Sequence, residues 1–122
     1  MTGEETTVAA TDEHAGSLVR VVTDDTFEAE VLKSERPVLL EFTADWCGPC
    51  RMLAPILKSI AEDESERLMV AALDVDANPT TVQKYGVMAM PTLMVFRAGE
   101  PVKSLVGARP KGRLMRELED VL

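Results

Sequence analysis

The sequence predicts an α/β protein, a three-layer α/β/α sandwich with a central mixed sheet and the element order β-α-β-α-β-α-β-β-α. Two apolar runs, Val38–Thr43 and Leu68–Asp74, are nearly continuous, which is typical of strands covered on both faces. Helical patterns alternate with the strands of the first half, which implies parallel pairing through helical crossovers. The last two strands, Thr92–Arg97 and Val102–Val106, are joined by a short segment with Gly and Pro that indicates an antiparallel hairpin.

Local patterns between residues 18 and 37 define the first elements. Leu18–Val22 is rich in β-branched residues and is expected to form a strand. Thr23 can cap the helix that follows, with Asp24 and Asp25 where the positive helix N-terminus favours acids. The residues expected on the buried face of this helix are Phe27, Val31 and Leu32. Pro37 ends the unit, and the first covered strand follows it.

A long helix, a short helix and a closing helix complete the prediction. The long helix follows Cys50, and its apolar stripe consists of Met52, Leu53, Ile56, Leu57 and Ile60. Asn78 and Pro79 are expected to start the short helix, which ends at Gly86 because glycine readily adopts the left-handed C-cap conformation. The closing helix starts near Pro110 and is expected to bury Leu114, Leu118 and Val121.

Length and charge exclude several classes of function. The chain has 122 residues, which suits one domain. Its net charge is −8 and it has no basic block, so it would repel nucleic-acid backbones and anionic membrane surfaces. No apolar run approaches the ~18 residues that a membrane span needs. We therefore expect neither nucleic acid nor membrane among the partners.

The first part of the chain differs in composition from the rest. Residues 1–17 carry four acids and no Lys or Arg, and they show no periodicity. We expect a disordered acidic tail over residues 1–17 and one folded domain over residues 18–122. A secretory signal requires a basic start and an apolar middle, which this segment lacks, so we expect a cytoplasmic location.

The two cysteines are the main candidates for chemistry. Cys47 and Cys50 stand between a covered strand and a helix start, where open α/β sheets place their sites. Because His14 is the only histidine, the chain cannot supply the four Cys or His ligands of a structural zinc site, and we expect no metal. Unpaired amides and the dipole at the helix start should favour a Cys47 thiolate, the form that attacks a disulfide.

A disulfide between these cysteines requires a distorted helix start. Residues three apart in a regular helix have Cβ atoms about 5–6 Å apart, whereas a disulfide needs about 3.8 Å. Gly48 and Pro49 favour a turn entering a helix, and a proline in the first turn loses no needed hydrogen bond. The alternatives to a redox-active pair are an inert surface dithiol or half of a metal site shared between chains.

The motifs around the cysteines resemble those of the thioredoxin family. They are Trp46-Cys47-Gly48-Pro49-Cys50 after an apolar strand, Pro55 in the next helix, and Met90-Pro91-Thr92 further along. The resemblance covers residues 18–122 and implies the thioredoxin-like fold. It implies a protein-disulfide reductase in which Cys47 attacks the target disulfide and Cys50 resolves the mixed disulfide, leaving a reversible Cys47–Cys50 disulfide.

The family resemblance also implies cofactors and partners. No cofactor is expected to be bound, because the cysteine pair is itself the redox-active centre. The expected partners are disulfide-containing proteins and an NADPH-dependent thioredoxin reductase that recycles a monomeric electron carrier. Such a protein contributes to electron transport and cell redox homeostasis. Two alternatives stay open, namely an oxidase or isomerase of the same fold, which Gly-Pro between the cysteines disfavours, and a binding module with an incidental dithiol.

Glu41 is a lone acid inside an apolar strand. Burial raises the pKa of a carboxyl group and lets it exchange protons near neutrality. The family usually has Asp here, which implies that Glu41 accepts the proton of Cys50; the alternative is that its longer stem reaches solvent. Two further departures are Ala72, where a Lys often pairs with that acid, and Thr43, where an aromatic residue is frequent.

A third group of residues is expected to hold the target. The resemblance implies a cis peptide bond before Pro91, whereas an ordinary trans-proline at a strand entrance is the alternative. It also implies an apolar surface around Cys47, to which Trp46 contributes. The other residues expected on this surface are Val87, Met88, Ala89, Met90, Gly107 and Ala108. For the methionines at 88 and 90, core filling is an equal alternative.

Overall fold

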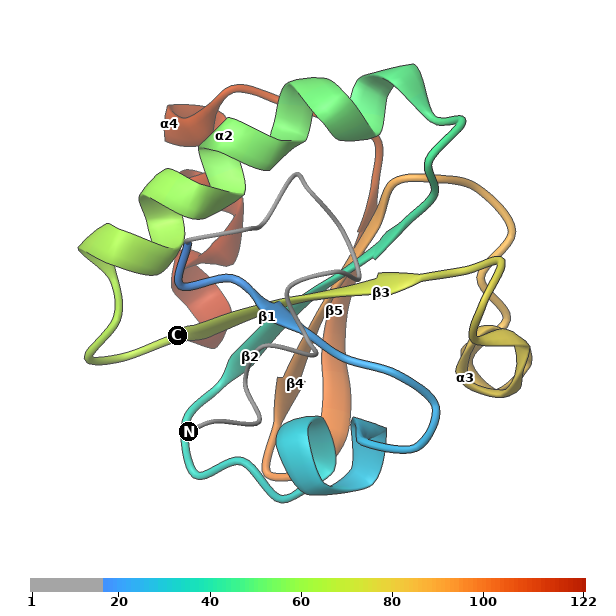
Figure 1. Ribbon diagram of the computed structural model, residues 1–122. Coiled ribbons are helices and arrows are strands. Elements are labelled where there is room, and N and C mark those ends of the chain that lie inside the picture. The colour runs from blue at the N-terminus through green and yellow to red at the C-terminus, as the bar shows by residue number, and fades with distance from the viewer. Residues whose placement is uncertain (1–16) are drawn as a thin grey trace.

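The computed structural model describes residues 17–122, in which helices cover both faces of a five-stranded sheet (Figure 1). The predicted acidic tail, residues 1–17, lies outside the described residues except for Ser17. The strands are β1 (Arg20–Val21), β2 (Val38–Thr43), β3 (Met69–Asp74), β4 (Thr92–Arg97) and β5 (Glu100–Val106). The helical elements are η2 (Glu28–Leu32), α2 (Gly48–Asp63), α3 (Pro79–Tyr85), α4 (Lys111–Leu118) and η3 (Glu119–Val121).

The sheet is mixed, as the sequence predicts. Its strand order is β1-β3-β2-β4-β5. Strands β1 and β2 pair parallel to β3, whereas β4 pairs antiparallel to both β2 and β5. The parallel pairs come from the alternating first half, where a helix carries the chain back to the same end of the sheet. The antiparallel pairs come from the hairpin.

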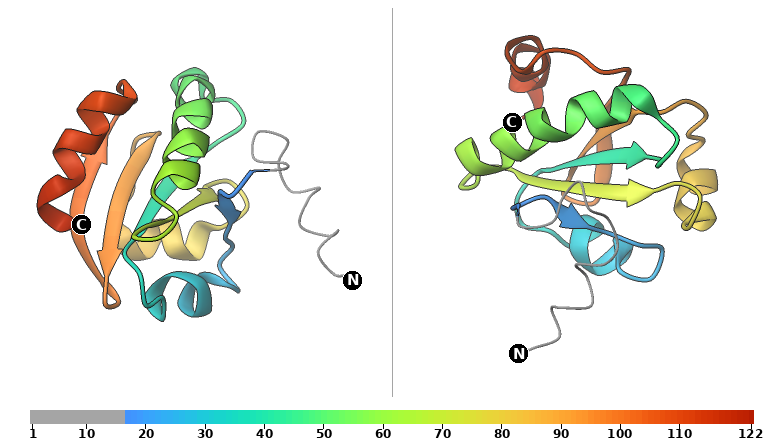
Figure 2. Two further views of the ribbon diagram at one scale, coloured as in Figure 1. Left: turned by 90° about the vertical axis from the view of Figure 1, so that its left-hand side faces the viewer. Right: turned by 45° about the horizontal axis from the view of Figure 1, so that its top comes forward.

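Two apolar cores lie on opposite faces of the sheet. Between the sheet and the helices α2 and α4, the core includes Leu39, Leu53, Leu57, Ile60, Leu93, Leu114 and Leu118. On the other face, beneath η2 and α3, it includes Phe27, Val31, Leu40, Phe42, Leu73 and Phe96. Figure 2 shows from two further directions how the helices lie on the two faces of the sheet. Successive residues of a covered strand enter opposite cores, which explains the nearly continuous apolar runs.

The first strand and helix are shorter than the sequence suggests. Only Arg20 and Val21 of the predicted strand Leu18–Val22 form β1, which is an edge strand paired on one side. The helix is a single π-type turn in which the Lys33 amide donates to the Glu28 carbonyl at 3.0 Å. Its predicted contacts form, because Phe27 and Val31 are both buried.

Asp24 does not act at the start of its own helix. Its carboxylate accepts hydrogen bonds from the Thr80 amide at 3.1 Å and the Thr81 amide at 2.9 Å, and so caps α3 from a distant loop. Asn78 is the N-cap residue by position, but its side chain makes no cap bond. Its Oδ1 instead accepts from the Asp24 amide at 2.8 Å. Asp24 therefore caps α3 in place of Asn78, and the Asn78 side chain holds the loop that contains Asp24.

The hairpin is tighter than expected. Glu100 and Pro101 already pair with Arg97 and Phe96 in the β4–β5 ladder, so only Ala98 and Gly99 form the turn. Both have positive φ, 51° and 82°, which suits a two-residue turn between twisted strands. Pro101 lacks an amide hydrogen, which an edge strand with a register shift tolerates.

Candidate active site

Strand register brings three separate segments to one end of the sheet. Thr92 at the start of β4 pairs with Phe42 near the end of β2 and with Val106 at the end of β5. The loop after β2, the loop before β4 and the loop after β5 therefore leave the sheet at the same end. These loops contain the candidate residues Cys47, Pro91 and Gly107 of the sequence analysis. In Figure 1 this is also the end at which α2 begins.

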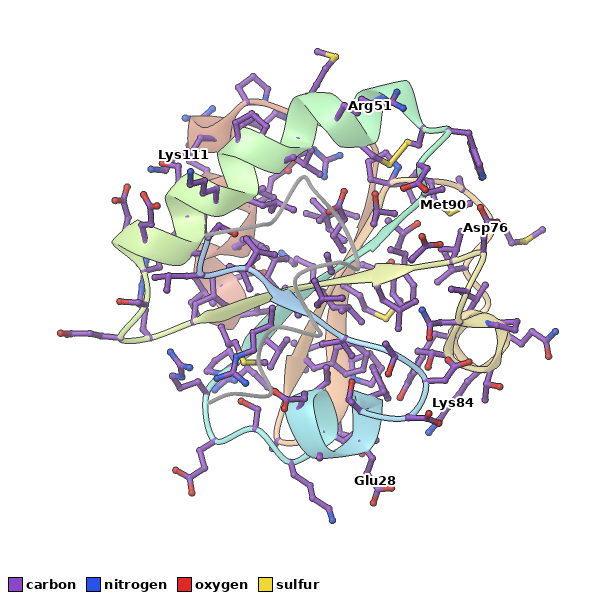
Figure 3. The ribbon with its side chains drawn as sticks, in the orientation of Figure 1. Glu28, Arg51, Asp76, Lys84, Met90 and Lys111 are labelled. Carbon is purple, nitrogen blue, oxygen red and sulfur yellow. A yellow bond between two sulfur atoms is a disulfide. The ribbon has the colours of Figure 1, made fainter. Side chains whose placement is uncertain are left out.

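Cys47 and Cys50 form a disulfide at the start of α2, with their Cα atoms 5.3 Å apart (Figure 3). Cys47 stands just outside the helix as its N-cap residue, with φ −94° and ψ 107°. This extended backbone is the departure from a regular helix that brings the two side chains within disulfide reach. Gly48 and Pro49 are the first two residues of α2, and both are exposed.

The helix start is arranged to stabilise a negative charge on Cys47. The Cys50 amide donates to Cys47 Sγ over 3.2 Å. This amide is one of the first-turn donors that have no partner within the helix, and the dipole of the 16-residue α2 points its positive end at the same sulfur. Cys50 is more deeply enclosed, with 1% of its surface exposed against 4% for Cys47. The geometry therefore favours a thiolate at Cys47 once the disulfide is reduced.

Trp46, which precedes Cys47, has an exposed side chain next to the cysteines. It is 63% exposed, and its indole Nε1 donates to Asp76 Oδ2 over 2.8 Å. Asp76 follows β3, and its amide donates to Asp74 Oδ1 at 2.8 Å, which holds the turn. Sequence reasoning missed Asp76. A signal was available in the sequence, because Asp76 follows β3 just as Trp46 follows β2. These two strands are parallel neighbours and end at the same edge of the sheet, so residues that follow them can meet.

Glu41 lies in the middle of β2, between Ala72 on β3 and Leu93 on β4. Both neighbours belong to the core beneath α2, so the Glu41 side chain points to the face that carries the cysteine helix. Glu41 is 1% exposed, so the alternative in which its stem reaches solvent is wrong. A strand with covered neighbours on both sides leaves the carboxyl group no path outward. The register also confirms that Ala72 stands beside the acid.

The segment before β4 packs against the cysteines. The Met90–Pro91 peptide bond is cis. Met90 is half-buried against the cluster of Ala44, Cys47 and Cys50, and Figure 3 shows it on the same side of the molecule as the disulfide. Met88 is 91% exposed, which excludes core filling for this side chain. Ala89 is exposed as well, and its carbonyl accepts from Thr92 Oγ1 at 2.6 Å, which ties the segment to β4.

The segment after β5 is bonded to the segment before β4. The Gly107 amide donates to the Pro91 carbonyl at 2.9 Å. Gly107 has φ +99°, a conformation that side-chain-bearing residues rarely adopt. Ala108 is partly buried against the core beneath α2 and α4. The structure thus brings Trp46, Met90, Pro91 and Gly107 to the edge that carries the disulfide.

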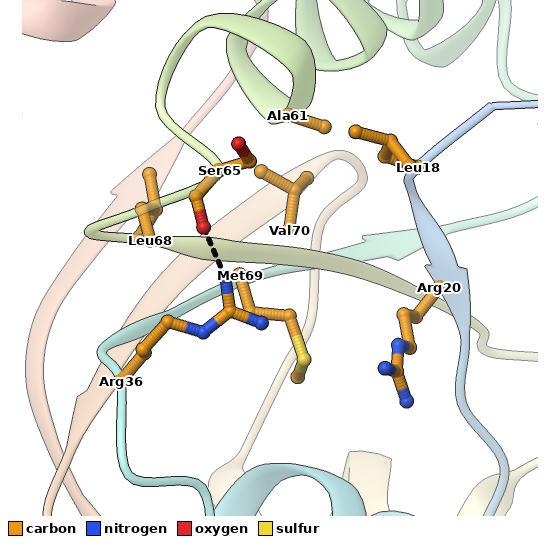
Figure 4. A pocket seen from close by; sticks show the side chains of 8 residues that line it. All are labelled: Leu18, Arg20, Arg36, Ala61, Ser65, Leu68, Met69 and Val70. Carbon is orange, nitrogen blue, oxygen red and sulfur yellow. Dashed lines mark hydrogen bonds between the residues drawn. The ribbon is translucent and has the colours of Figure 1, made fainter.

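Other surface features lie away from the cysteines. A hollow of about 160 Å³ lies near the C-terminal end of α2, where Arg36 donates to the Ser65 carbonyl (Figure 4). Cys47 and Cys50 stand at the opposite end of that helix. Within residues 17–122, no cluster of three or more His, Cys, Asp or Glu side chains could hold a metal ion. Over the same residues, no helix has the length and apolar character for crossing a membrane.

Known proteins match the chain over almost its whole described length. The family model described as Thioredoxin matches residues 18–120. A thioredoxin from Streptomyces clavuligerus is 54% identical over 99 residues, which cover 81% of this chain and 92% of that protein. A thioredoxin from Mycobacterium tuberculosis (strain ATCC 25618 / H37Rv) is 48% identical over 112 residues, which cover 92% of this chain and 96% of that protein.

One relative is a larger protein whose name combines a thioredoxin with a thioredoxin reductase. The bifunctional thioredoxin reductase/thioredoxin of Mycobacterium leprae is 46% identical over 114 residues. These cover 93% of this chain but 25% of that protein, so this chain corresponds to one part of it.

Proposed function

We propose a division of roles within the site of this chain, which belongs to the thioredoxin family and is a protein-disulfide oxidoreductase with a dithiol active site. Cys47 is the attacking sulfur and Cys50 the resolving one. The observation that carries this assignment is the N-cap position of Cys47, whose sulfur accepts the Cys50 amide at 3.2 Å. A thiolate attacks disulfides and a thiol does not, so the sulfur that the helix start stabilises reacts first.

The reaction proceeds in two exchanges from the dithiol form. Cys47 thiolate attacks one sulfur of the target disulfide; a new S–S bond forms, and the other target sulfur leaves as a thiolate that takes up a proton. Cys50, as a thiolate, then attacks the Cys47 sulfur of this mixed disulfide. The second target sulfur leaves and is protonated in turn. The target has gained two electrons and two protons, and the Cys47–Cys50 disulfide seen in the structure is the oxidised product.

Glu41 is proposed to accept the proton that Cys50 loses before the second exchange. It is buried on the face of β2 that lies beneath α2, the helix that contains Cys50. Its register neighbour on β3 is Ala72, a small uncharged residue. A water molecule can complete the path between the two groups.

The target is proposed to dock on the apolar edge around the cysteines. The residues of this docking surface are Trp46, Met88, Ala89, Met90, Pro91, Gly107 and Ala108. Methionine side chains adapt to irregular partners, which suits a protein that must accept varied targets. The Met90 backbone, which precedes Pro91, is proposed to pair with an extended target segment.

The oxidised chain needs a two-electron donor to complete the cycle. We infer an NADPH-dependent thioredoxin reductase, which the fused relative of Mycobacterium leprae supports by its name. The protein would then act as a monomeric electron carrier in the cytoplasm, with disulfide-containing proteins as its targets. It requires no bound cofactor, because the electrons reside in the cysteine pair.

Trapping experiments test the assignment of the two cysteines. Cys50→Ser should accumulate a mixed disulfide with a protein target, visible as a shifted band on a non-reducing gel, because its second exchange is blocked. Cys47→Ser should form none and should not turn over with NADPH and a thioredoxin reductase. Trapping of a target through Cys50 in the Cys47→Ser variant would reverse the proposed roles, whereas turnover by this single-cysteine variant would exclude the dithiol mechanism. A scaffold with an incidental dithiol would trap no target with either variant.

A further inference from the structure

A charged side chain that is largely withdrawn from solvent holds the loop between β5 and α4. The side chain of Arg109 is only 10% exposed. Its Nη2 donates to the Val106 carbonyl at 2.9 Å, and its Nε lies 3.4 Å from Glu117 Oε1 on α4. The guanidinium therefore links the last residue of β5 to α4 and closes the loop 107–110 between them.

This ion pair is not explained by stability alone. Arg109 Nε, Arg109 Nη1 and Glu117 Oε1 are buried and have no hydrogen-bond partner among the described residues. Glu117 keeps 29% of its side chain exposed, so the loss of water falls mainly on Arg109. An ion pair that costs one partner its water and leaves atoms unsatisfied adds little stability over apolar side chains of similar volume. What such a pair does provide is one defined geometry. The geometry that this pair defines is the path of the chain from β5 to α4.

The loop that Arg109 closes includes part of the docking surface. Gly107 and Ala108 lie between the two anchor points of the guanidinium, Val106 and α4. The Gly107 amide donates to the Pro91 carbonyl at 2.9 Å, so a displacement of this loop would disturb the segment before β4 as well. Met90 in that segment packs against Cys47 and Cys50. A continuous set of contacts thus leads from Arg109 to the surface around the cysteines.

We propose that Arg109 is a positioning residue for protein targets, which holds the Gly107–Ala108 loop in the conformation that a target contacts. The inference rests on the proposed function, since it takes this loop to be part of the docking surface. It assigns Arg109 no part in the sulfur chemistry. Loss of Arg109 should therefore weaken the reduction of protein disulfides and leave the reduction of a small disulfide unchanged.

Arg113 provides a matched control in the same ion-pair cluster. Its Nε lies 3.3 Å from Glu117 Oε2, so both arginines share one carboxylate. Arg113 is 59% exposed, however, and both it and Glu117 belong to α4, so their pair does not bridge to the loop. A general contribution of charge pairing to α4 would appear in both variants, whereas a positioning role belongs to Arg109 alone.

The experiment compares two substrates for the full chain and its variants Arg109→Met, Arg109→Lys and Arg113→Met. Each protein is reduced beforehand, and second-order rate constants are measured with insulin and with bis(2-hydroxyethyl) disulfide, which is too small to need the docking surface. We expect Arg109→Met to react with insulin roughly five- to tenfold more slowly and with the small disulfide within about twofold of the original rate. Arg113→Met should match the original protein with both substrates.

The lysine variant separates positioning from folding. Lysine keeps a positive charge near Glu117 but cannot reproduce the fork of a guanidinium, so Arg109→Lys should show an intermediate loss with insulin only. Equal losses with both substrates, or no loss with insulin in either Arg109 variant, would overturn the inference and leave the proposed function intact. If Arg109→Met does not fold, as judged by circular dichroism, the same criteria apply to Arg109→Lys. Failure of the original protein to reduce either substrate would overturn the proposed function itself.

Discussion

Replacing Gly107 by alanine should destabilise the protein although nothing obstructs the added methyl group. A Cβ at this position would meet no atom within 4 Å, so any cost comes from the backbone. Gly107 has φ +99°, well outside the range that an L-residue prefers. Left-handed backbone costs an alanine about 1–2 kcal/mol. Part of this cost is offset, because alanine also restricts the unfolded chain by about 0.4–1 kcal/mol relative to glycine.

A matched substitution at a second glycine, Gly112, allows the effect of alanine on the unfolded chain to be subtracted from the change in unfolding free energy. Gly112 is the second residue of α4, and a Cβ there would meet only the flexible end of Arg116 at 3.6 Å, an ordinary contact. Gly112→Ala makes the same change to the unfolded chain without left-handed strain, and it should stabilise by about 0.4–1 kcal/mol. The difference in unfolding free energy between the two variants thus isolates the backbone cost at Gly107, expected to be at least about 1–2 kcal/mol.

Urea unfolding followed by circular dichroism measures this difference. With a denaturant slope of about 2 kcal/mol per molar, the two midpoints should lie about 0.5–1 M apart, with Gly107→Ala the lower. The slopes should agree, because a methyl group changes the exposed area on unfolding very little. Equal midpoints, or a Gly107→Ala midpoint above that of Gly112→Ala, would refute the argument from φ. The bond from the Gly107 amide to Pro91 makes slower insulin reduction a second expected effect.

Three further predictions concern the site and its supports. Asp76→Ala removes the acceptor of the Trp46 indole and should lower the rate constant for insulin reduction by about fivefold, or about 1 kcal/mol; fluorescence of Trp46, the only tryptophan, would show whether its environment changes. Glu41→Gln should remove one ionisation from the pH–rate profile of disulfide reduction, and an unchanged profile would exclude Glu41 as the proton acceptor. Loss of water raises the pKa of Asp24, but hydrogen bonds from Thr81 and Thr80 outweigh this effect and hold the pKa below 3.8. Asp24 therefore stabilises the fold above that pH, and the stability difference between the original protein and Asp24→Asn should shrink as the pH falls below 3.8, whereas a constant difference would contradict the capping role.

Periodicity in the sequence was sufficient to predict the class of fold and most of its elements. The covered strands β2 and β3 and the helix α4 lie where their apolar patterns place them, since burial against a sheet requires those patterns. Element ends were less predictable. β1 is shorter than its β-branched run because an edge strand has one neighbour, and β5 begins earlier than its apolar residues because Glu100 and Pro101 pair at an exposed edge.

The cysteine motif shows what sequence can establish about a site. The position of Cys47 and Cys50 before a helix predicted a helix start that favours an anion, and the structure has Cys47 at that N-cap. Their disulfide was implied by the family resemblance, because the spacing alone allows it only with a distorted first turn, and the structure shows it. Glu41 was a candidate as a lone acid in an apolar strand, but only the register showed that the carboxyl group is buried beneath α2.

Contacts between distant segments were decided by the tertiary structure. Asp76 holds Trp46 over a separation of 30 residues, and Asp24 caps a helix that begins more than 50 residues later. Arg109 and Glu117 meet because α4 packs back over the end of β5. Local patterns record which face of an element is apolar, and so the sequence by itself determined the layers and the reactive pair. Which polar side chains meet across loops depends on how the elements are docked, and only the folded chain shows that.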